Sequence, residues 1–307
     1  MTLQQLEYVM AVYRCKHFAK AADYCNVTQP TLSSMIQKLE DELGVKIFDR
    51  SKQPIKPTTE GMLIIERAWS ILVRAKQLKE VVEEERHSLS GTFHIAVLPT
   101  IAPYLIPRFL PQFMNEYPAL DIRITEMKTE DIHRALKHGD IDAGIVAQVE
   151  GQEDFDSQQL YFEKFFVYVS KGDALFNNKA IRTSDLTEYL WLLDEGHCFR
   201  EQLVKFCHLK SAAKSKKAYN LGSIETFMRI VESGKGVTFI PELALEQLTE
   251  VQEELVRPFA HPIPTRDIIL LTQKNFLRTS LRQLVIDKIR ASVPAGMLRM
   301  NKTQQAL

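Results

Sequence analysis

The sequence predicts an α/β protein built in three parts. Apolar side chains recur at helical spacing through the first forty-five residues or so, which predicts a small helical unit. Residues 59–87 contain no proline and keep a seven-residue apolar repeat, which predicts one long helix. From residue 91 onward, short apolar runs alternate with helical patterns, as is typical of a sheet with helices packed on it.

Length and composition limit the classes of protein that fit. A chain of 307 residues, 45% hydrophobic and 25% charged, is an ordinary globular protein with room for two or three compact units. Its formal net charge is zero, and residues 1–58 hold eight Lys/Arg against six Asp/Glu, so charge alone does not indicate a nucleic-acid partner. Neither a secretory signal nor a membrane-spanning run is apparent. We therefore expect no membrane contact and a cytoplasmic location, where structural disulfides are rare.

The N-terminal part has the pattern of a helix-turn-helix. Two short helices precede a third that we expect over residues 29–43, with Thr28 as its N-cap and Gly44 at its end. The expected buried stripe of this third helix is Leu32, Ile36, Leu39 and Leu43. Short polar side chains on its other faces suit base edges and phosphates in a major groove. A generic three-helix bundle with a solvated polar face would give the same pattern, so both interpretations stay open here.

A small basic wing is expected after the third helix. Two strand-like pieces, residues 45–49 and 55–58, flank a short loop that carries Arg50 and Lys52. Cations in such a loop suit contacts to phosphates, which position a protein on DNA without reading its sequence.

The same residues resemble a known family. The unbroken run 18–33, together with residues 38–44, 48–50 and 58–61, is similar to the LysR-type transcriptional regulators. The resemblance implies that residues 1–58 form a winged helix-turn-helix domain that binds double-stranded DNA. It also implies that the following side chains face the DNA: Gln29, Thr31, Ser33, Ser34, Lys38, Arg50 and Lys52.

The long helix expected from residue 59 onward carries a coiled-coil pattern. Its apolar residues step alternately by four and three positions, which is the spacing of a seam that needs a partner helix. The seam consists of Ile64, Ala68, Ile71, Ala75, Leu78 and Val82. We therefore expect residues 59–90 to be a dimerisation linker, and the family resemblance agrees. A two-fold dimer would read a near-palindromic operator.

Residues 91–300 are expected to form an α/β regulatory domain. The alternation of strands and helices predicts a mainly parallel sheet, and the pattern restarts near residue 165. Two subdomains, with the chain returning to the first near residue 267, would enclose a cleft as periplasmic solute-binding proteins do. Residues 301–307 are expected to be a flexible polar tail.

Two threonines follow the first two expected strands of this domain. Thr100 and Thr129 would lie where the carboxyl ends of parallel strands meet, and ligands gather at that edge in open α/β sheets. Simple N-capping of the next helix is the alternative, and spacing alone favours it.

The two C-terminal cysteines have surroundings that suggest redox chemistry. A helix near 198–207 would separate Cys198 from Cys207 by roughly 13.5 Å along its axis, which is too far for a disulfide. A disulfide would therefore require the helix to come apart, and that would be a two-state switch. His197, Arg200 and the helix N-terminus are expected to lower the pKa of Cys198, favouring the thiolate that peroxide attacks.

Other interpretations of the cysteines stay open from the residues alone. Cys198 and Cys207 could be unrelated core residues, as we expect Cys15 and Cys25 to be in the helix-turn-helix core. A metal site is disfavoured because few nitrogen ligands are near and no Cys-x-x-Cys spacing is present. We expect neither a metal nor a cofactor.

The segment around Cys198 resembles the redox segment of the peroxide-sensing members of the LysR-type family. The matching residues are His197, Cys198, Arg200, Gln202, Phe206 and Cys207. The resemblance implies that Cys198 is the peroxidatic thiol and Cys207 the resolving one. It also implies that peroxide is held by Thr100, Thr129, His197 and Arg266, with Arg266 favouring the anionic sulfur.

Three functions are compatible with these sequence patterns. The leading hypothesis is a redox-sensing transcription activator, not an enzyme, that responds to hydrogen peroxide as a dimer of dimers and works with RNA polymerase. The second is a LysR-type regulator controlled by a small metabolite in the cleft, with the cysteines as bystanders. The third, a thiol peroxidase, is disfavoured by the helix-turn-helix.

Overall fold

The chain forms two compact units, Met1–Arg86 and His87–Leu307. The computed structural model describes residues 1–51, 53–85, 89–186, 190–193, 198–207, 223–234 and 236–307, and the side chains of the long helix as far as Ala75 and at Leu78. In this described part of the chain, no helix is both long and apolar enough to cross a membrane.

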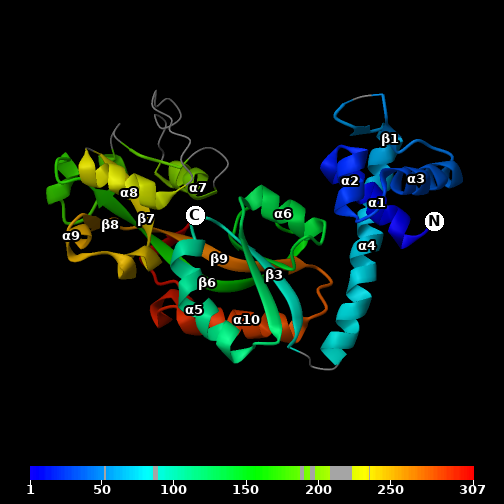
Figure 1. Ribbon diagram of the computed structural model, residues 1–307. Helices are drawn as coiled ribbons and strands as arrows, with labels where there is room; N and C mark the ends of the chain where they lie inside the picture. The colour runs from blue at the N-terminus through cyan, green and yellow to red at the C-terminus, as the bar shows by residue number, and fades with distance from the viewer. Residues whose placement is uncertain (52, 86–88, 187–189, 194–197, 208–222, 235) are drawn as a thin grey trace. The chain divides into compact units, whose positions relative to one another are not determined.

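The N-terminal unit is a winged helix-turn-helix with a long helix attached (Figure 1). Its elements are α1 (Leu3–Cys15), α2 (Phe18–Tyr24), α3 (Gln29–Leu43), β1 (Phe48–Asp49), β2 (Lys56–Pro57) and α4 (Thr59–Glu85). The two short strands pair antiparallel, with Phe48 opposite Pro57. The predicted fold of this unit is confirmed.

Local sequence explains where α3 begins and ends. The Thr28 hydroxyl accepts a hydrogen bond from the Thr31 backbone N–H, 3.4 Å away, and Gly44 ends the helix with a positive φ of 71°. Three residues of the predicted stripe are fully buried, but Leu43 is 41% exposed. It is the last residue of the helix, and its neighbour Gly44 is exposed too. The prediction that Leu43 is buried was wrong.

The beginning of α4 belongs to the core of the N-terminal unit. Ala68 and Trp69 are buried with side chains of the first three helices and the wing. The rings of Tyr13 and Trp69 meet edge-on, 5.5 Å apart. Gly61 has no room for a side chain, because a Cβ there would lie 1.9 Å from the carbonyl oxygen of Ile47. This close approach fixes α4 against the wing.

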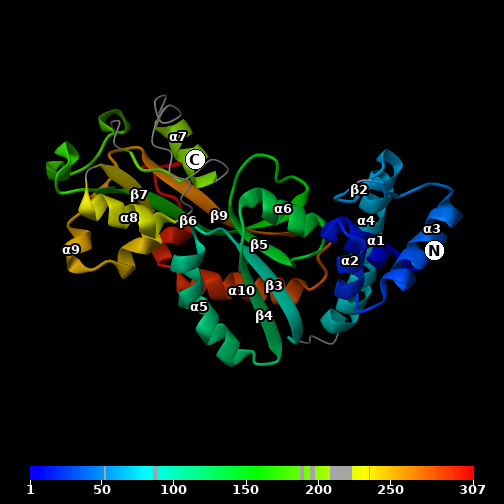
Figure 2. The same cartoon turned by 45° about the horizontal axis from the view of Figure 1, so that its top comes forward.

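The C-terminal unit is a mixed sheet covered by helices (Figures 1 and 2). Its strands are β3 (Gly91–Val97), β4 (Leu120–Glu126), β5 (Ala143–Ala147), β6 (Phe155–Val169), β7 (Val237–Pro241), β8 (Val256–Pro258), β9 (Ile263–Gln273) and β10 (Gln304–Ala306). Its helices are α5 (Ala102–Glu116), α6 (Thr129–Lys137), α7 (Cys198–Phe206), α8 (Ile224–Ser233), α9 (Glu250–Glu253) and α10 (Thr279–Ser292). A short 3-10 helix, Glu242–Gln247, follows β7.

The strand order is β4-β3-β5-β9-β6-β7, with β10 beside β9 and β8 beside β6. β3 pairs parallel with β4 and β5, whereas β9 returns antiparallel to β5. β6 pairs antiparallel with β9 over its first part and with β7 and β8 over its last. The sheet is therefore mixed, and the expectation of a mainly parallel sheet was wrong. Every antiparallel pair of this sheet involves β6 or β9, and the apolar pattern did not reveal the polar start of β6.

The end of the chain also differs from expectation. Gln304–Ala306 forms β10, which pairs parallel with the start of β9, and the Leu307 N–H donates to the Thr265 carbonyl at 3.1 Å. The expected flexible tail is thus a strand, because β9 offers unpaired backbone groups at this edge.

Candidate functional site

The two C-terminal cysteines lie at opposite ends of α7. Cys198 is the first residue of the helix, and Cys207 directly follows its last residue, Phe206. Both side chains are buried and both are free thiols. The predicted helix is confirmed, and it keeps the two sulfurs too far apart to bond.

Arg266 on β9 is the centre of a buried polar group. Its Nε donates to Glu163 Oε2 at 2.8 Å, and its second terminal nitrogen lies 2.6 Å from the same oxygen. The other terminal nitrogen, Nη1, donates to Thr100 Oγ1 at 3.0 Å. Nη2, the terminal nitrogen beside Glu163, also donates to the Thr100 carbonyl at 3.0 Å. Arg266 is fully buried, so this network joins β9, β6 and the turn between β3 and α5 inside the protein.

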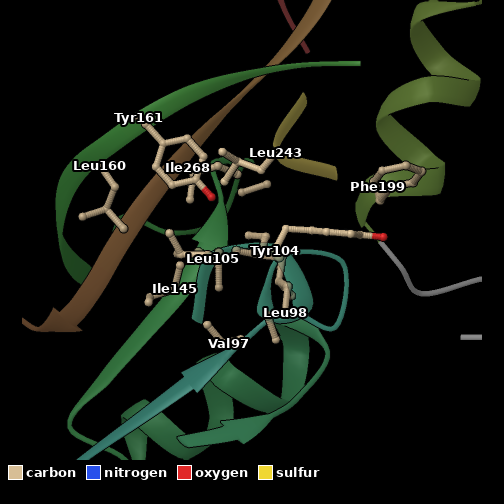
Figure 3. Close-up of a cluster of buried hydrophobic side chains, with 14 of the residues drawn as sticks. Val97, Leu98, Tyr104, Leu105, Ile145, Leu160, Tyr161, Phe199, Leu243 and Ile268 are labelled. Carbon is tan, nitrogen blue, oxygen red and sulfur yellow. The ribbon is translucent and has the colours of Figure 1, made fainter. Parts of the chain in front are cut away.

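Two aromatic rings enclose the Arg266 guanidinium. It lies 5.3 Å from the centre of the Phe165 ring and 5.5 Å from that of Phe199. These rings meet edge-on at 4.9 Å. Figure 3 shows Tyr104 extending from α5 toward Phe199. Because Phe199 directly follows Cys198, its packing ties the beginning of α7 to Arg266.

Opposing effects act on the pKa of the Cys198 thiol. Burial raises its pKa, whereas the Thr129 hydroxyl, the Arg266 charge and the Phe199 backbone N–H lower it and Glu201 raises it further. Burial prevails, so the pKa of Cys198 is raised in this arrangement. The expectation of a lowered pKa was therefore wrong, although Arg266 acts in the expected direction. Burial alone raises the pKa of Cys207 to about 12.

Two buried polar atoms near Cys198 lack a hydrogen bond of good geometry within the described residues. They are Thr129 Oγ1, which lies beside the thiol, and Gln202 Oε1, one helical turn after it. The amide nitrogen of Gln202 donates to the Gln148 carbonyl at 3.2 Å, which fixes the orientation of this side chain. Buried polar atoms left unpaired can be satisfied by a small polar molecule. The sequence pattern assigned Gln202 no role, although its position four residues after Cys198 places it on the same helix face.

Neither threonine of the predicted pocket acts as a helix cap. The N-cap of α5 is Ile101 and that of α6 is Lys128, so the capping interpretation was wrong for Thr100 and Thr129. The predicted His197 lies outside the described residues. None of the described His, Cys, Asp and Glu side chains gather in threes or more to hold a metal ion.

The predicted DNA-binding side chains lie along α3 and the wing. Gln29, Thr31, Ser34 and Lys38 are exposed and Ser33 is half-buried, while Lys52 lies outside the described residues.

Arg50, which we expected to contact phosphates, is held by the protein itself. It lies 3.2 Å from the fully buried Glu40 and donates to Ser33 Oγ at 3.4 Å. Glu40 Oε1 also accepts from the backbone N–H groups of Ile47 and Phe48 at 2.9 and 3.4 Å. Glu40, which the sequence pattern did not single out, therefore joins α3 to the wing.

The predicted coiled-coil seam on α4 divides into two parts. Ile64 and Ala68 pack against the core of the N-terminal unit. Ile71 and Leu78 are exposed, Leu78 by 71%, although both are large and apolar. The side chain of Val82 lies outside the described part.

Both units match models of one protein family. Residues 3–62 match the "Bacterial regulatory helix-turn-helix protein, lysR family", and residues 86–294 match the "LysR substrate binding domain". The chain belongs to the LysR family of bacterial transcriptional regulators. LysR proteins are regulators and not a family of enzymes.

Similar LysR-family proteins share a printed description. The "Hydrogen peroxide-inducible genes activator" of Pectobacterium carotovorum subsp. carotovorum is 34% identical over 304 residues, which cover 98% of this chain and 100% of the relative. The crystal structure of OxyR from Porphyromonas gingivalis is 45% identical with a TM-score of 0.67, covering 71% of this chain and 99% of that one. A full-length OxyR variant from Pseudomonas aeruginosa is 31% identical with a TM-score of 0.74, covering 94% and 98%.

Proposed function

We propose that this chain is a LysR-type activator that senses hydrogen peroxide through Cys198 and responds by forming a Cys198–Cys207 disulfide. The observation that carries the proposal is the position of Cys198. It is a buried free thiol at the start of an intact helix, beside the Thr129 hydroxyl, with a second buried thiol at the other end. Relatives described as hydrogen peroxide-inducible genes activators support it.

The proposed chemistry needs only peroxide and the two thiols. The Cys198 thiolate attacks one peroxide oxygen; an S–O bond forms, the O–O bond breaks and the departing hydroxide takes up a proton to become water. Cys207 then attacks the sulfur of the sulfenic acid, forming the S–S bond and releasing a second water. We propose that peroxide is held by the predicted pocket residues Thr100, Thr129, His197 and Arg266. Gln202, whose buried Oε1 lacks a partner among the described residues, joins them.

The proposed signal is the loss of α7. Because the helix keeps the sulfurs apart, a disulfide forms only after the helix unwinds, and Phe199 then leaves the Arg266 guanidinium. The rearrangement would alter how the subunits pair and how their DNA-binding domains are spaced.

The output we propose is DNA binding by residues 1–58 to a near-palindromic operator, through the exposed side chains of α3. Residues 59–90 are the proposed dimerisation linker, supported by the exposed Ile71 and Leu78, and residues 91–300 the regulatory domain of two subdomains. We further propose that the chain assembles as a dimer of dimers and contacts RNA polymerase in the cytoplasm.

The deciding experiment compares Cys198→Ser with Cys15→Ser, a partly buried cysteine in the other unit. Transcription from a bound promoter is measured in vitro before and after peroxide. We expect Cys198→Ser to bind DNA but to lose the peroxide response, and Cys15→Ser to keep both. A retained response in Cys198→Ser contradicts the proposal, and protection from thermal unfolding by a metabolite would then favour control by a small ligand.

A further inference from the structure

We propose that Glu163 is a positioning residue that restrains the reactivity of Cys198 by holding and neutralising Arg266. The inference rests on the proposed function only in taking Cys198 as the reactive thiol. It concerns a carboxylate on β6 that does not touch the sulfur itself.

The contacts of Arg266 leave its charge compensated. Glu163 is 1% exposed, and one of its oxygens receives both the Nε and a terminal nitrogen of the guanidinium. Thr100 takes the hydrogen bonds of both terminal nitrogens. The guanidinium has five N–H donors in a fixed planar fork, so these contacts fix its plane and occupy most of its donors.

Glu163 is in turn held from a second side. Its other oxygen accepts from the backbone N–H of Leu243, 3.4 Å away, at the start of the 3-10 helix after β7. Glu163 therefore cannot swing away from Arg266 without leaving a buried N–H unpaired. The carboxylate keeps the guanidinium turned toward β6 and Thr100.

The charged groups that act on the Cys198 sulfur are few in the described part of the chain. Arg266 lowers the pKa of the thiol and Glu201 on α7 raises it, while Thr129 on α6 and the Phe199 N–H lower it as neutral donors. Among the described residues, Arg266 is thus the cation that stabilises the thiolate. A cation paired with a buried anion exerts a weaker field on a third group than the same cation alone, because the two charges oppose each other.

The substitution Glu163→Gln tests this directly. Glutamine keeps the shape and one acceptor oxygen, but it removes the opposing charge. If the pKa of Cys198 falls by about one unit, its thiolate fraction at neutral pH rises about tenfold. The lower basicity reduces the nucleophilicity of that thiolate about threefold, so the net gain in alkylation rate is about threefold.

The assay uses the reduced full-length chain, without peroxide or DNA. The rate of Cys198 alkylation by iodoacetamide is followed from pH 6 to pH 10 by mass spectrometry of the Cys198 peptide. The matched control is Glu242→Gln, which removes a carboxylate paired with Lys164 at 2.9 Å rather than with Arg266. We expect Glu163→Gln to shift the pH profile downward and Glu242→Gln to leave it in place.

Two further variants separate this role from a merely structural one. In an Arg266→Gln background, Glu163→Gln is expected to have no effect on the pH profile, because the proposed route runs through Arg266. Glu163→Asp keeps the charge but draws it back from Arg266, so we expect a smaller shift in the same direction. It also provides the test if the glutamine variant does not fold.

An unchanged or slower alkylation rate in the folded Glu163 variants would overturn the proposal, and so would an equal effect in the Arg266→Gln background. Because the readout is the thiol itself, the result stands whether or not Cys198 proves to be the peroxide sensor. Failure of this inference is therefore distinguishable from failure of the proposed function.

Discussion

Cys198 and Cys207 are buried at the two ends of the same helix, which holds the two thiols too far apart to form a disulfide. Helix stability therefore opposes disulfide formation directly. Whatever weakens α7 should favour the disulfide, and whatever strengthens it should delay the disulfide. Phe199 is the largest of the buried side chains at the start of α7.

Cys207→Ser should separate oxidation from the conformational change. Peroxide can still convert Cys198 to the sulfenic acid, but the second thiol is absent, so α7 is expected to remain helical. Trapping with a sulfenic-acid reagent and mass spectrometry should detect the modified Cys198 peptide. Far-UV circular dichroism should change on oxidation of the wild type and not of the variant. Loss of the same helical signal in the oxidised variant would show that the disulfide is not what unwinds α7.

Phe199→Ala should loosen the beginning of α7. The substitution removes a buried ring that packs on Phe165 and on Arg266, and a large-to-small change of this kind costs about 3 kcal/mol of unfolding free energy. We expect the Cys198–Cys207 disulfide to form faster as a result. Urea unfolding and quenched thiol counting measure the two effects. Phe206→Ala, at the half-buried end of the same helix, is the control and should lose less stability.

Much of the N-terminal fold could be predicted because the signals are local. Thr28 and Gly44 mark the two ends of α3 by their own chemistry, and the structure has both caps. Glu40 could not be predicted in the same way. In the sequence, Glu40 has the pattern of a solvent-exposed charge on a helix. It is buried because the wing folds back onto α3 and covers it.

The candidate site was predicted from the sequence as a set of residues but not as an arrangement. Thr100 and Arg266 are 166 positions apart, and only the strand order β3-β5-β9 of the folded sheet brings them to 3.0 Å. Glu163 escaped notice because a charged residue in a strand is usually exposed, and a bulge near Leu160 interrupts the alternation that would have placed it on the buried face. The raised pKa of Cys198 likewise depends on burial, which spacing does not reveal.

Asp267 should make the stability of the C-terminal unit depend on pH. Burial raises the pKa of its carboxyl to about 6, against a small opposing influence of Gln159. A carboxyl with a raised pKa in the folded state stabilises the fold while it is protonated. That contribution is complete below about pH 4 and is lost as the pH rises through about 6.

Asp267→Asn removes this titration. We expect the variant to gain about 1 kcal/mol relative to the wild type between pH 4.5 and pH 7.5, a value reduced for the partial exposure of the carboxyl. Urea unfolding of both proteins at the two pH values measures the difference, and the exposed Asp121→Asn serves as the control. A difference between Asp267→Asn and the wild type that does not change with pH would count against the assignment.

Lys38 and Arg50 should affect DNA binding in different ways, although both are basic residues of the proposed DNA-binding surface. Lys38 is exposed on α3, so Lys38→Ala should weaken binding mainly by losing a phosphate contact. The slope of log affinity against log salt should then fall by about one. Arg50 is paired with the buried Glu40, so Arg50→Ala leaves that carboxylate with fewer partners and should lower the melting temperature of the N-terminal unit as well. Salt-dependent binding to a fixed operator, measured together with thermal unfolding, distinguishes the two. If Arg50→Ala changed the salt slope and left the melting temperature unaltered, Arg50 would contact phosphate directly and its bond to Glu40 would be incidental.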